Sequence, residues 1–125
     1  MVKPRVIVFL ILASIFASVH RVASLASLYW YYWWFDIVMH FWGGLLIGFG
    51  VHAMTTFSFV RVRPTTLVVF LVISVTVVSW EVFEWIYGLY DPATHLIDTG
   101  SDIILGFSGG LLAHFVLANR YNSSI

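Results

Sequence analysis

Hydrophobic residues fill four long stretches of this chain, and short polar connections separate them. The stretches of 15 or more residues without Asp, Glu, Lys or Arg are residues 6–20, 37–60, 64–80 and 103–119. A bilayer is crossed by roughly 20 residues of α-helix. The pattern therefore predicts four transmembrane helices, over residues 6–29, 36–60, 65–89 and 99–119.

The connections predict how these helices are arranged. Arg63-Pro64 separates the second helix from the third, because proline disfavours helix at the residue before it, and Asp91-Pro92 begins the last connection in the same way. Short connections favour antiparallel neighbours. We therefore expect an all-α polytopic membrane protein, an up-down bundle that forms a single transmembrane domain over residues 1–125.

Composition excludes several other classes of protein. Of 125 residues, 61% are hydrophobic and 10% are charged, and the mean hydropathy is +0.95, whereas soluble domains carry ~25% charged residues. The formal net charge is 0 and basic residues form no cluster, which excludes a nucleic-acid-binding protein. The absence of cysteine excludes disulfides, thiolate catalysis and cysteine-ligated metals.

The basic residues predict the orientation in a cell (inner or plasma) membrane. Cytoplasmic flanks are enriched in Lys and Arg, and five of the six basic residues fall on one predicted side: Lys3, Arg5, Arg61, Arg63 and Arg120. Both termini should therefore face the cytoplasm. The run Tyr29–Phe35, seven consecutive aromatic residues at the opposite boundary, is typical of an interfacial anchor in contact with membrane lipid, although a substrate-stacking surface is the alternative.

All six acidic residues fall at the outer ends of helices or in the outer connection. Residues three or four apart share a helix face, and three predicted helices each carry such a pair. The pairs are Asp36 with His40, Glu81 with Glu84, and Asp98 with Asp102. These six side chains lie at similar depth, and we expect them to form one cluster.

Glycine spacing predicts that two of these faces point inward. One row at four-residue spacing runs from His40 through Gly44 and Gly48 to His52. A second row comprises Asp98, Asp102, Gly106, Gly110 and His114. Glycine at this spacing lets membrane helices approach closely, so the rows that carry the polar groups are also the expected packing faces.

The cluster has an excess of negative charge. Without the looser Asp91 it holds five carboxylates against one fixed cation, Arg21. Protonation, water from the outer side or one or two divalent cations would each remove this excess. Mixed carboxylate and imidazole ligands suit zinc, manganese or iron, and an oxygen-rich shell suits magnesium.

Simpler roles exist for several of these residues. Asp36 and Asp98 lie where helix N-caps are expected. Arg21 is either an internal counter-ion for Glu81 or Glu84, or an exposed residue that snorkels to the interface. His20, His52 and His114 lie outside the predicted cluster, and we interpret them as structural. His95 lies in the predicted outer loop, where it is either a surface residue or a further ligand.

These residues resemble those of the VanZ-like and YjdF-like small integral membrane proteins. The resemblance rests on Asp36-Ile-Val-Met-His40-Phe41 with Gly43 and Gly44, on Glu81-Val-Phe-Glu84-Trp85, and on Asp98-Thr-Gly-Ser-Asp102 with the helix 106–113. It implies a helical membrane fold, of which this chain would be a reduced four-helix core, and a link to cell-envelope glycolipid or glycopeptide chemistry. This chain lacks the Gln and the Pro-Gly-Arg-like stretch that the VanZ pattern has before its last Asp.

Three classes of function follow from these features. The first is a metal-dependent enzyme or binding protein at the outer leaflet, with the carboxylates and His40 as ligands. The second is a proton- or cation-coupled carrier that uses the same carboxyl groups, although four helices leave little room for alternating access without a homo-oligomer. The third is an accessory subunit that joins other membrane subunits.

Overall fold

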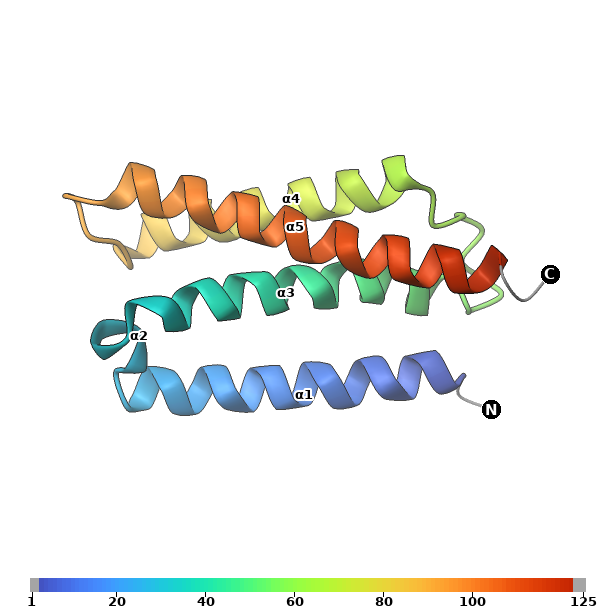
Figure 1. Cartoon of the computed structure of the whole chain (residues 1–125), viewed down its shortest axis with the longest axis horizontal. Coiled ribbons are helices and arrows are strands. Elements are labelled where there is room, and N and C mark those ends of the chain that lie inside the picture. Colours follow the sequence, from blue (N-terminus) through green and yellow to red (C-terminus); the bar gives the residue numbers. More distant parts are fainter. Residues whose placement is uncertain (1–2, 123–125) are drawn as a thin grey trace.

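Four long helices and one short helix make up the fold of the residues that the structure describes. A computed structural model describes residues 3–122, and its long helices are α1 (Pro4–Leu25), α3 (Trp33–Met54), α4 (Thr66–Tyr87) and α5 (His95–Asn122), with α2 (Leu28–Tyr31) between the first two (Figure 1). Each long helix is long and apolar enough to cross a membrane. The prediction of an all-α, multi-pass membrane protein is confirmed.

The helix boundaries differ from the predicted ones around the aromatic run. α1 ends at Leu25 because the chain turns at Ser27, whose φ of 56° is left-handed. Tyr29, the last residue of the first predicted helix, therefore lies in α2, and the aromatic run continues from α2 into the first turn of α3. The second predicted helix also ends earlier, at Met54.

Two acidic residues lie inside helices where N-caps were an alternative. Tyr32 is the N-cap of α3, so Asp36 lies in its first turn, and α5 begins at His95, which places Asp98 in its first turn. The capping interpretation is wrong for both residues. Both carboxylates still lie at the positive end of a helix dipole, which favours negative charge.

α4 has clear signals at both ends. The Thr65 side chain accepts a hydrogen bond from the Val68 backbone N–H, at 3.3 Å, and caps the N-terminus. At the other end Gly88 adopts a φ of 65°, a left-handed conformation that glycine reaches without a steric penalty.

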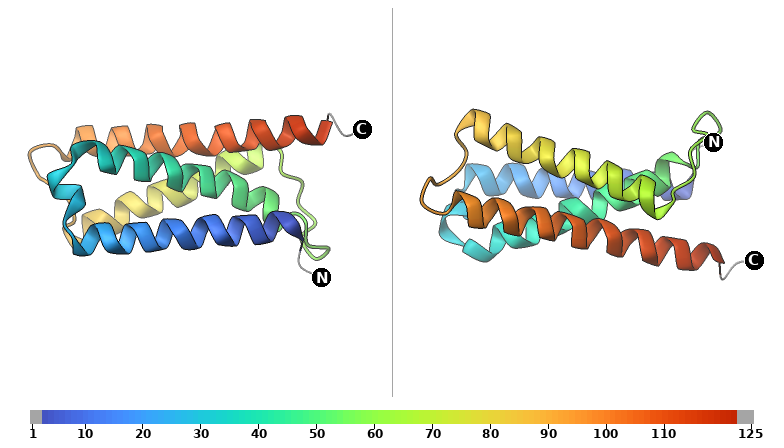
Figure 2. Two further views of the ribbon diagram at one scale, coloured as in Figure 1. Left: turned by 60° about the horizontal axis from the view of Figure 1, so that its bottom comes forward. Right: turned by 90° about the horizontal axis from the view of Figure 1, so that it is seen from above.

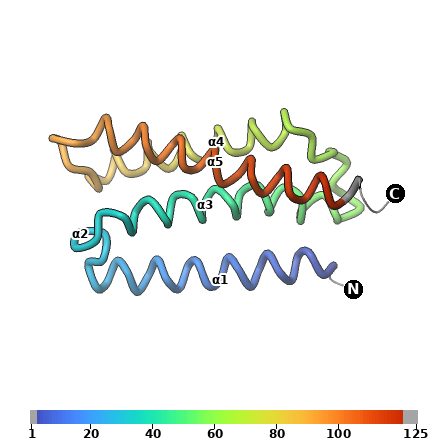
Figure 3. Tube along the Cα trace, viewed as in Figure 1, coloured from blue at the N-terminus to red at the C-terminus, as the bar shows by residue number. Residues whose placement is uncertain are grey.

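Successive long helices are antiparallel, as the short connections predicted, and consequently α3 and α5 run parallel (Figures 1 and 3). α3 lies between α1 and the α4–α5 pair, an arrangement that the two further views also show (Figure 2). α1 begins and α5 finishes at the same end of the bundle. We call this the basic end, after Lys3, Arg5, Arg61, Arg63 and Arg120, and the opposite end, which holds all six acidic residues, the acidic end.

α3 and α5 are in backbone contact along four glycines, which we call the glycine seam: Gly44, Gly48, Gly106 and Gly110. A Cβ atom added at Gly44 would lie 2.2 Å from the carbonyl oxygen of Gly106, and one at Gly48 would lie 2.2 Å from that of Gly110. No residue with a Cβ atom fits at these positions without moving the two helices apart. The predicted packing of the two glycine rows is confirmed.

The buried row of α4 covers the glycine seam. Val69, Ile73 and Val77 are buried at four-residue spacing. Ile73 lies over Gly110 and Val77 over Gly106, each so close that a Cβ on the glycine would lie under 3.0 Å from the side chain. Branched side chains on α4 thus fill the space that the glycines leave open.

Candidate metal centre

The glycine seam brings an imidazole and a carboxylate together at the acidic end. His40 lies one turn before Gly44 on α3, and Asp102 lies one turn before Gly106 on α5. Because the two helices are parallel and in register, the side chains face each other, with His40 Nε2 3.5 Å from Asp102 Oδ2. Asp102 is buried, with 8% of its side chain exposed.

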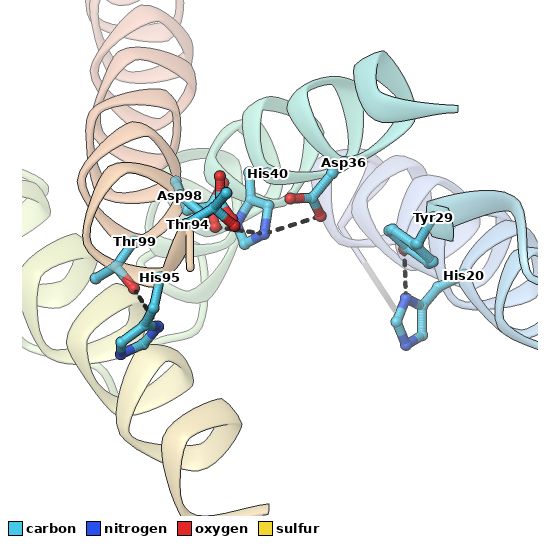
Figure 4. A network of polar contacts seen from close by, with 9 residues as sticks. His20, Tyr29, Asp36, His40, Thr94, His95, Asp98 and Thr99 are labelled. Carbon is cyan, nitrogen blue, oxygen red and sulfur yellow. Dashed lines mark hydrogen bonds and ion pairs between the residues drawn. The ribbon is translucent and has the colours of Figure 1, made fainter. Parts of the chain in front are cut away.

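Asp36 approaches the same imidazole from its own helix. Its Oδ1 lies 3.3 Å from His40 Nε2, one turn along α3, as Figure 4 shows. The Asp36 side chain is 40% exposed, so it lies at the rim of the cluster. The spacing of these two residues predicted this contact.

α4 adds the third side of the cluster. Glu81 continues the row of Val69, Ile73 and Val77 by one turn, so the packing of that row on the glycine seam places Glu81 beside Asp102. Glu81 is 8% exposed, and its buried Oε1 has no hydrogen-bond partner. A buried carboxylate oxygen without a partner is costly, so this atom is available to bind a proton, a hydrogen-bond donor or a cation.

The five residues form two groups of three that share Asp102. Ligand atoms of Asp36, His40 and Asp102 lie within 4.8 Å of one another, and so do those of Glu81, Glu84 and Asp102. Within the described residues no Lys or Arg side chain forms an ion pair with either group. The arrangement is therefore a layer of four carboxylates and one imidazole at membrane depth, with no fixed cation.

Two residues predicted for this cluster lie outside it. Asp98 is exposed and accepts a hydrogen bond from the Thr94 hydroxyl, at 2.5 Å, within the first turn of α5. Arg21 is exposed on α1 and forms no ion pair in the part of the chain that the structure describes. The structure thus brings together five of the six predicted ligands and leaves out the predicted counter-ion.

A tyrosine at the edge of the aromatic run lies within the field of the cluster. The Tyr29 hydroxyl lies 2.7 Å from His20 Nδ1, a contact drawn in Figure 4. Burial, together with the negative charges of Asp36 and Glu84, raises the pKa of Tyr29 to about 12. Its ring also packs edge-on against Phe35. Tyr29 is therefore a partly buried, neutral hydroxyl beside the acids, and sequence spacing gave no signal for it.

A second polar cluster closes the glycine seam at the basic end. His52 and His114 are buried, and His52 Nε2 lies 2.9 Å from His114 Nδ1. The other nitrogen of His114 lies 3.1 Å from the Thr66 hydroxyl of α4. The pair connects α3, α4 and α5, the arrangement expected of residues with a structural role. Its signal in the sequence was the position of each histidine one turn beyond a seam glycine.

Comparison with known proteins agrees with the membrane fold. No curated protein and no solved structure matches the chain. A family model described as "Predicted membrane protein (DUF2238)" matches residues 4–123, nearly the whole chain. This match supports a membrane protein family, without by itself supporting the VanZ-like or YjdF-like name. The chain belongs to the DUF2238 family of predicted membrane proteins.

Proposed function

We propose that this protein binds two divalent cations in the five-residue layer at the acidic end and acts there on a lipid-linked substrate. Asp36 and His40 would hold one ion, Glu81 and Glu84 would hold the other, and Asp102 would bridge them. The observation that carries this proposal is the sharing of Asp102 by two groups of potential ligands. A carboxylate has two oxygens and is the usual bridge between neighbouring cations in helical bundles.

Charge supports two ions over one. Four ionised carboxylates and a neutral imidazole carry four negative charges, and two divalent cations balance them. Uncompensated ionisable groups inside a membrane are costly. The partnerless Oε1 of Glu81 supports a cation on the α4 side of the layer, because a bound ion would satisfy this buried oxygen.

The donor set favours manganese or iron. Four carboxylates with one imidazole resemble, in chemistry though not in spacing, the carboxylate-rich di-iron and di-manganese sites of helical bundles. Zinc suits an imidazole-rich set, and magnesium prefers to keep several waters. Such cations polarise a bound phosphoryl or carbonyl oxygen and increase the acidity of a water.

The protein's own groups suit chemistry on a membrane substrate. Glu84 is only partly buried, so water and substrate can reach this side of the ligand layer. A cavity of about 260 Å³ between α4 and α5 reaches Glu81, and its other walls include Trp85, His95 and aliphatic side chains. These walls suit the apolar part of a lipid-linked molecule, and the link to envelope chemistry implied by the VanZ resemblance belongs to this proposal.

Metal-dependent stability tests the proposal. Protein stripped with chelator is melted in detergent with manganese, iron(II), zinc, magnesium or chelator alone, at two pH values. An ion at a hundredfold excess over its dissociation constant should stabilise the fold by ~2.7 kcal/mol. The gain should shrink as pH falls, because the ligands bind metal in their deprotonated forms.

Two neighbouring aspartates on α5 supply a matched control. Asp102→Asn should abolish the stabilisation and the bound metal, because it removes the shared ligand. Asp98→Asn should keep both, because Asp98 is exposed and outside the two groups. Metal content close to two ions per chain supports the paired site. Equal melting of the stripped wild type in every ion and in chelator refutes it.

The same melting series separates the two alternatives. A proton-coupled carrier predicts pH-dependent stability that divalent ions leave unchanged. An accessory subunit predicts little response to either pH or metal.

A further inference from the structure

An apolar groove opens toward the basic end of the bundle, far from the metal-ligand layer. It encloses about 680 Å³ between α1, α3 and α4 and the connection that follows α3. The α1 and α4 backbones do not approach each other closely in the described chain, since both pack on α3. At the acidic end the side chains of His20 and Trp80 close the gap. Toward the basic end it stays open.

Each wall of the groove is a row of side chains at four-residue spacing. Phe9 and Ala13 form the α1 wall, and Val68, Val72 and Thr76 form the α4 wall. Arg5 lies one turn before Phe9 on the same face of α1. The arginine therefore marks the mouth of the groove at the basic end.

Two further arginines lie at the same mouth. Val60 and Val62 line the groove, and Arg61 lies between them, with Arg63 next in the chain. Arg61 and Arg63 are exposed. The sequence has no acidic side chain at the basic end, and within the described residues none of the three guanidinium groups forms an ion pair with a carboxylate.

We propose that this groove is a binding site for an anionic phospholipid of the leaflet at the basic end. One acyl chain would lie along the apolar walls, and the headgroup phosphate would be held by Arg5, Arg61 and Arg63. The volume is within the ~300–1,000 Å³ of ordinary ligand sites. Basic pockets between transmembrane helices bind anionic headgroups through charge and hydrogen bonds.

Charge complementarity selects a lipid over a second protein chain. A groove at membrane depth is filled by lipid or by protein, because water there lacks hydrogen-bond partners. A transmembrane helix of a partner would leave the arginines without counter-charge, whereas an anionic lipid satisfies the apolar walls and the cationic mouth in one molecule.

Native mass spectrometry of the purified protein with added phosphatidylglycerol or phosphatidylcholine tests the site. We expect one tightly bound phosphatidylglycerol per chain and much weaker binding of phosphatidylcholine. Arg61→Gln and Arg63→Gln should each weaken phosphatidylglycerol binding about fivefold, the factor that corresponds to ~1 kcal/mol per basic side chain at a membrane surface. Arg120→Gln, at the same end but on α5, should leave binding unchanged.

Two valines of α4 test the groove itself without a change of charge. Val72→Trp fills the groove and should displace the lipid, whereas Val75→Trp, also exposed on α4 but outside the groove, should not. Equal binding of both lipids, an equal effect of Arg120→Gln, or full binding by Val72→Trp would each overturn the proposal. A dimer that Val72→Trp dissociates would identify a second copy of the chain as the occupant and would also overturn it.

Discussion

Substitution of a single seam glycine should separate α3 from α5. In Gly48→Ala the new Cβ would lie 2.2 Å from the Gly110 carbonyl oxygen and 3.0 Å from its carbonyl carbon and Cα. Ordinary van der Waals contact begins at 3.4 Å. The obstacle is backbone inside a helix, which cannot rotate aside as a side chain does. The two helices must therefore move apart by about 1 Å at this level.

The expected cost follows from that displacement. Forcing one extra carbon into a packed core costs ~1–3 kcal/mol, and backbone-to-backbone contact places this case at the upper limit. The neighbouring His52–His114 hydrogen bond, now 2.9 Å, would lengthen and lose ~1 kcal/mol. Alanine in a helix recovers ~1 kcal/mol relative to glycine. The net loss of unfolding free energy is therefore ~2–3 kcal/mol.

Unfolding in mixed detergent micelles, followed by tryptophan fluorescence, measures this loss. Gly100→Ala is the matched control on α5, because a Cβ added at Gly100 meets no atom within 4 Å. That variant should be as stable as wild type or gain up to ~1 kcal/mol from helix propensity. If Gly48→Ala were as stable as Gly100→Ala, the backbone contact between α3 and α5 would be wrong, and with it the geometry of the metal-ligand layer.

Four further outcomes are expected. Folding raises the pKa of Tyr29 from 10.0 to about 12, so the stability that Tyr29 contributes is present below pH 10 and lost as pH rises through that interval. The unfolding free energy of Tyr29→Phe should therefore fall less than that of wild type between these pH values, and identical pH dependence of the two proteins contradicts this. His114→Phe leaves a buried nitrogen of His52 unpaired and should cost ~1–3 kcal/mol in thermal unfolding, whereas no loss would exclude the hydrogen bond. Arg21→Leu should change stability by less than ~0.5 kcal/mol, because Arg21 is exposed; a loss of ~3–5 kcal/mol would instead reveal a buried ion pair. Thr94→Cys should react with impermeant thiol reagents added from outside the cell. Reaction only with reagents added from the cytoplasmic side would show that the orientation is the opposite of the predicted one.

The sequence by itself determined the features that one helix imposes on its own residues. Uncharged stretches of bilayer length predicted the four transmembrane helices. Four-residue spacing predicted the contact of Asp36 with His40 and the inward faces with Gly44 and Gly106, because the pitch of an α-helix fixes which residues share a face. The predicted helix boundaries near the aromatic run were wrong, because the left-handed turn at Ser27 contains no glycine or proline that would have indicated a turn in the sequence.

Only the tertiary structure decided which faces meet and at what register. Asp98 and Asp102 share a face of α5, yet Asp102 is buried among the ligands while Asp98 is exposed beside Thr94. The shared position of Asp102 and the pairing of His52 with His114 depend on the level at which α3 and α5 come into contact. That level is set by glycines on both helices at once and by the side chains of α4 that cover them. Spacing within one helix carries no information about it.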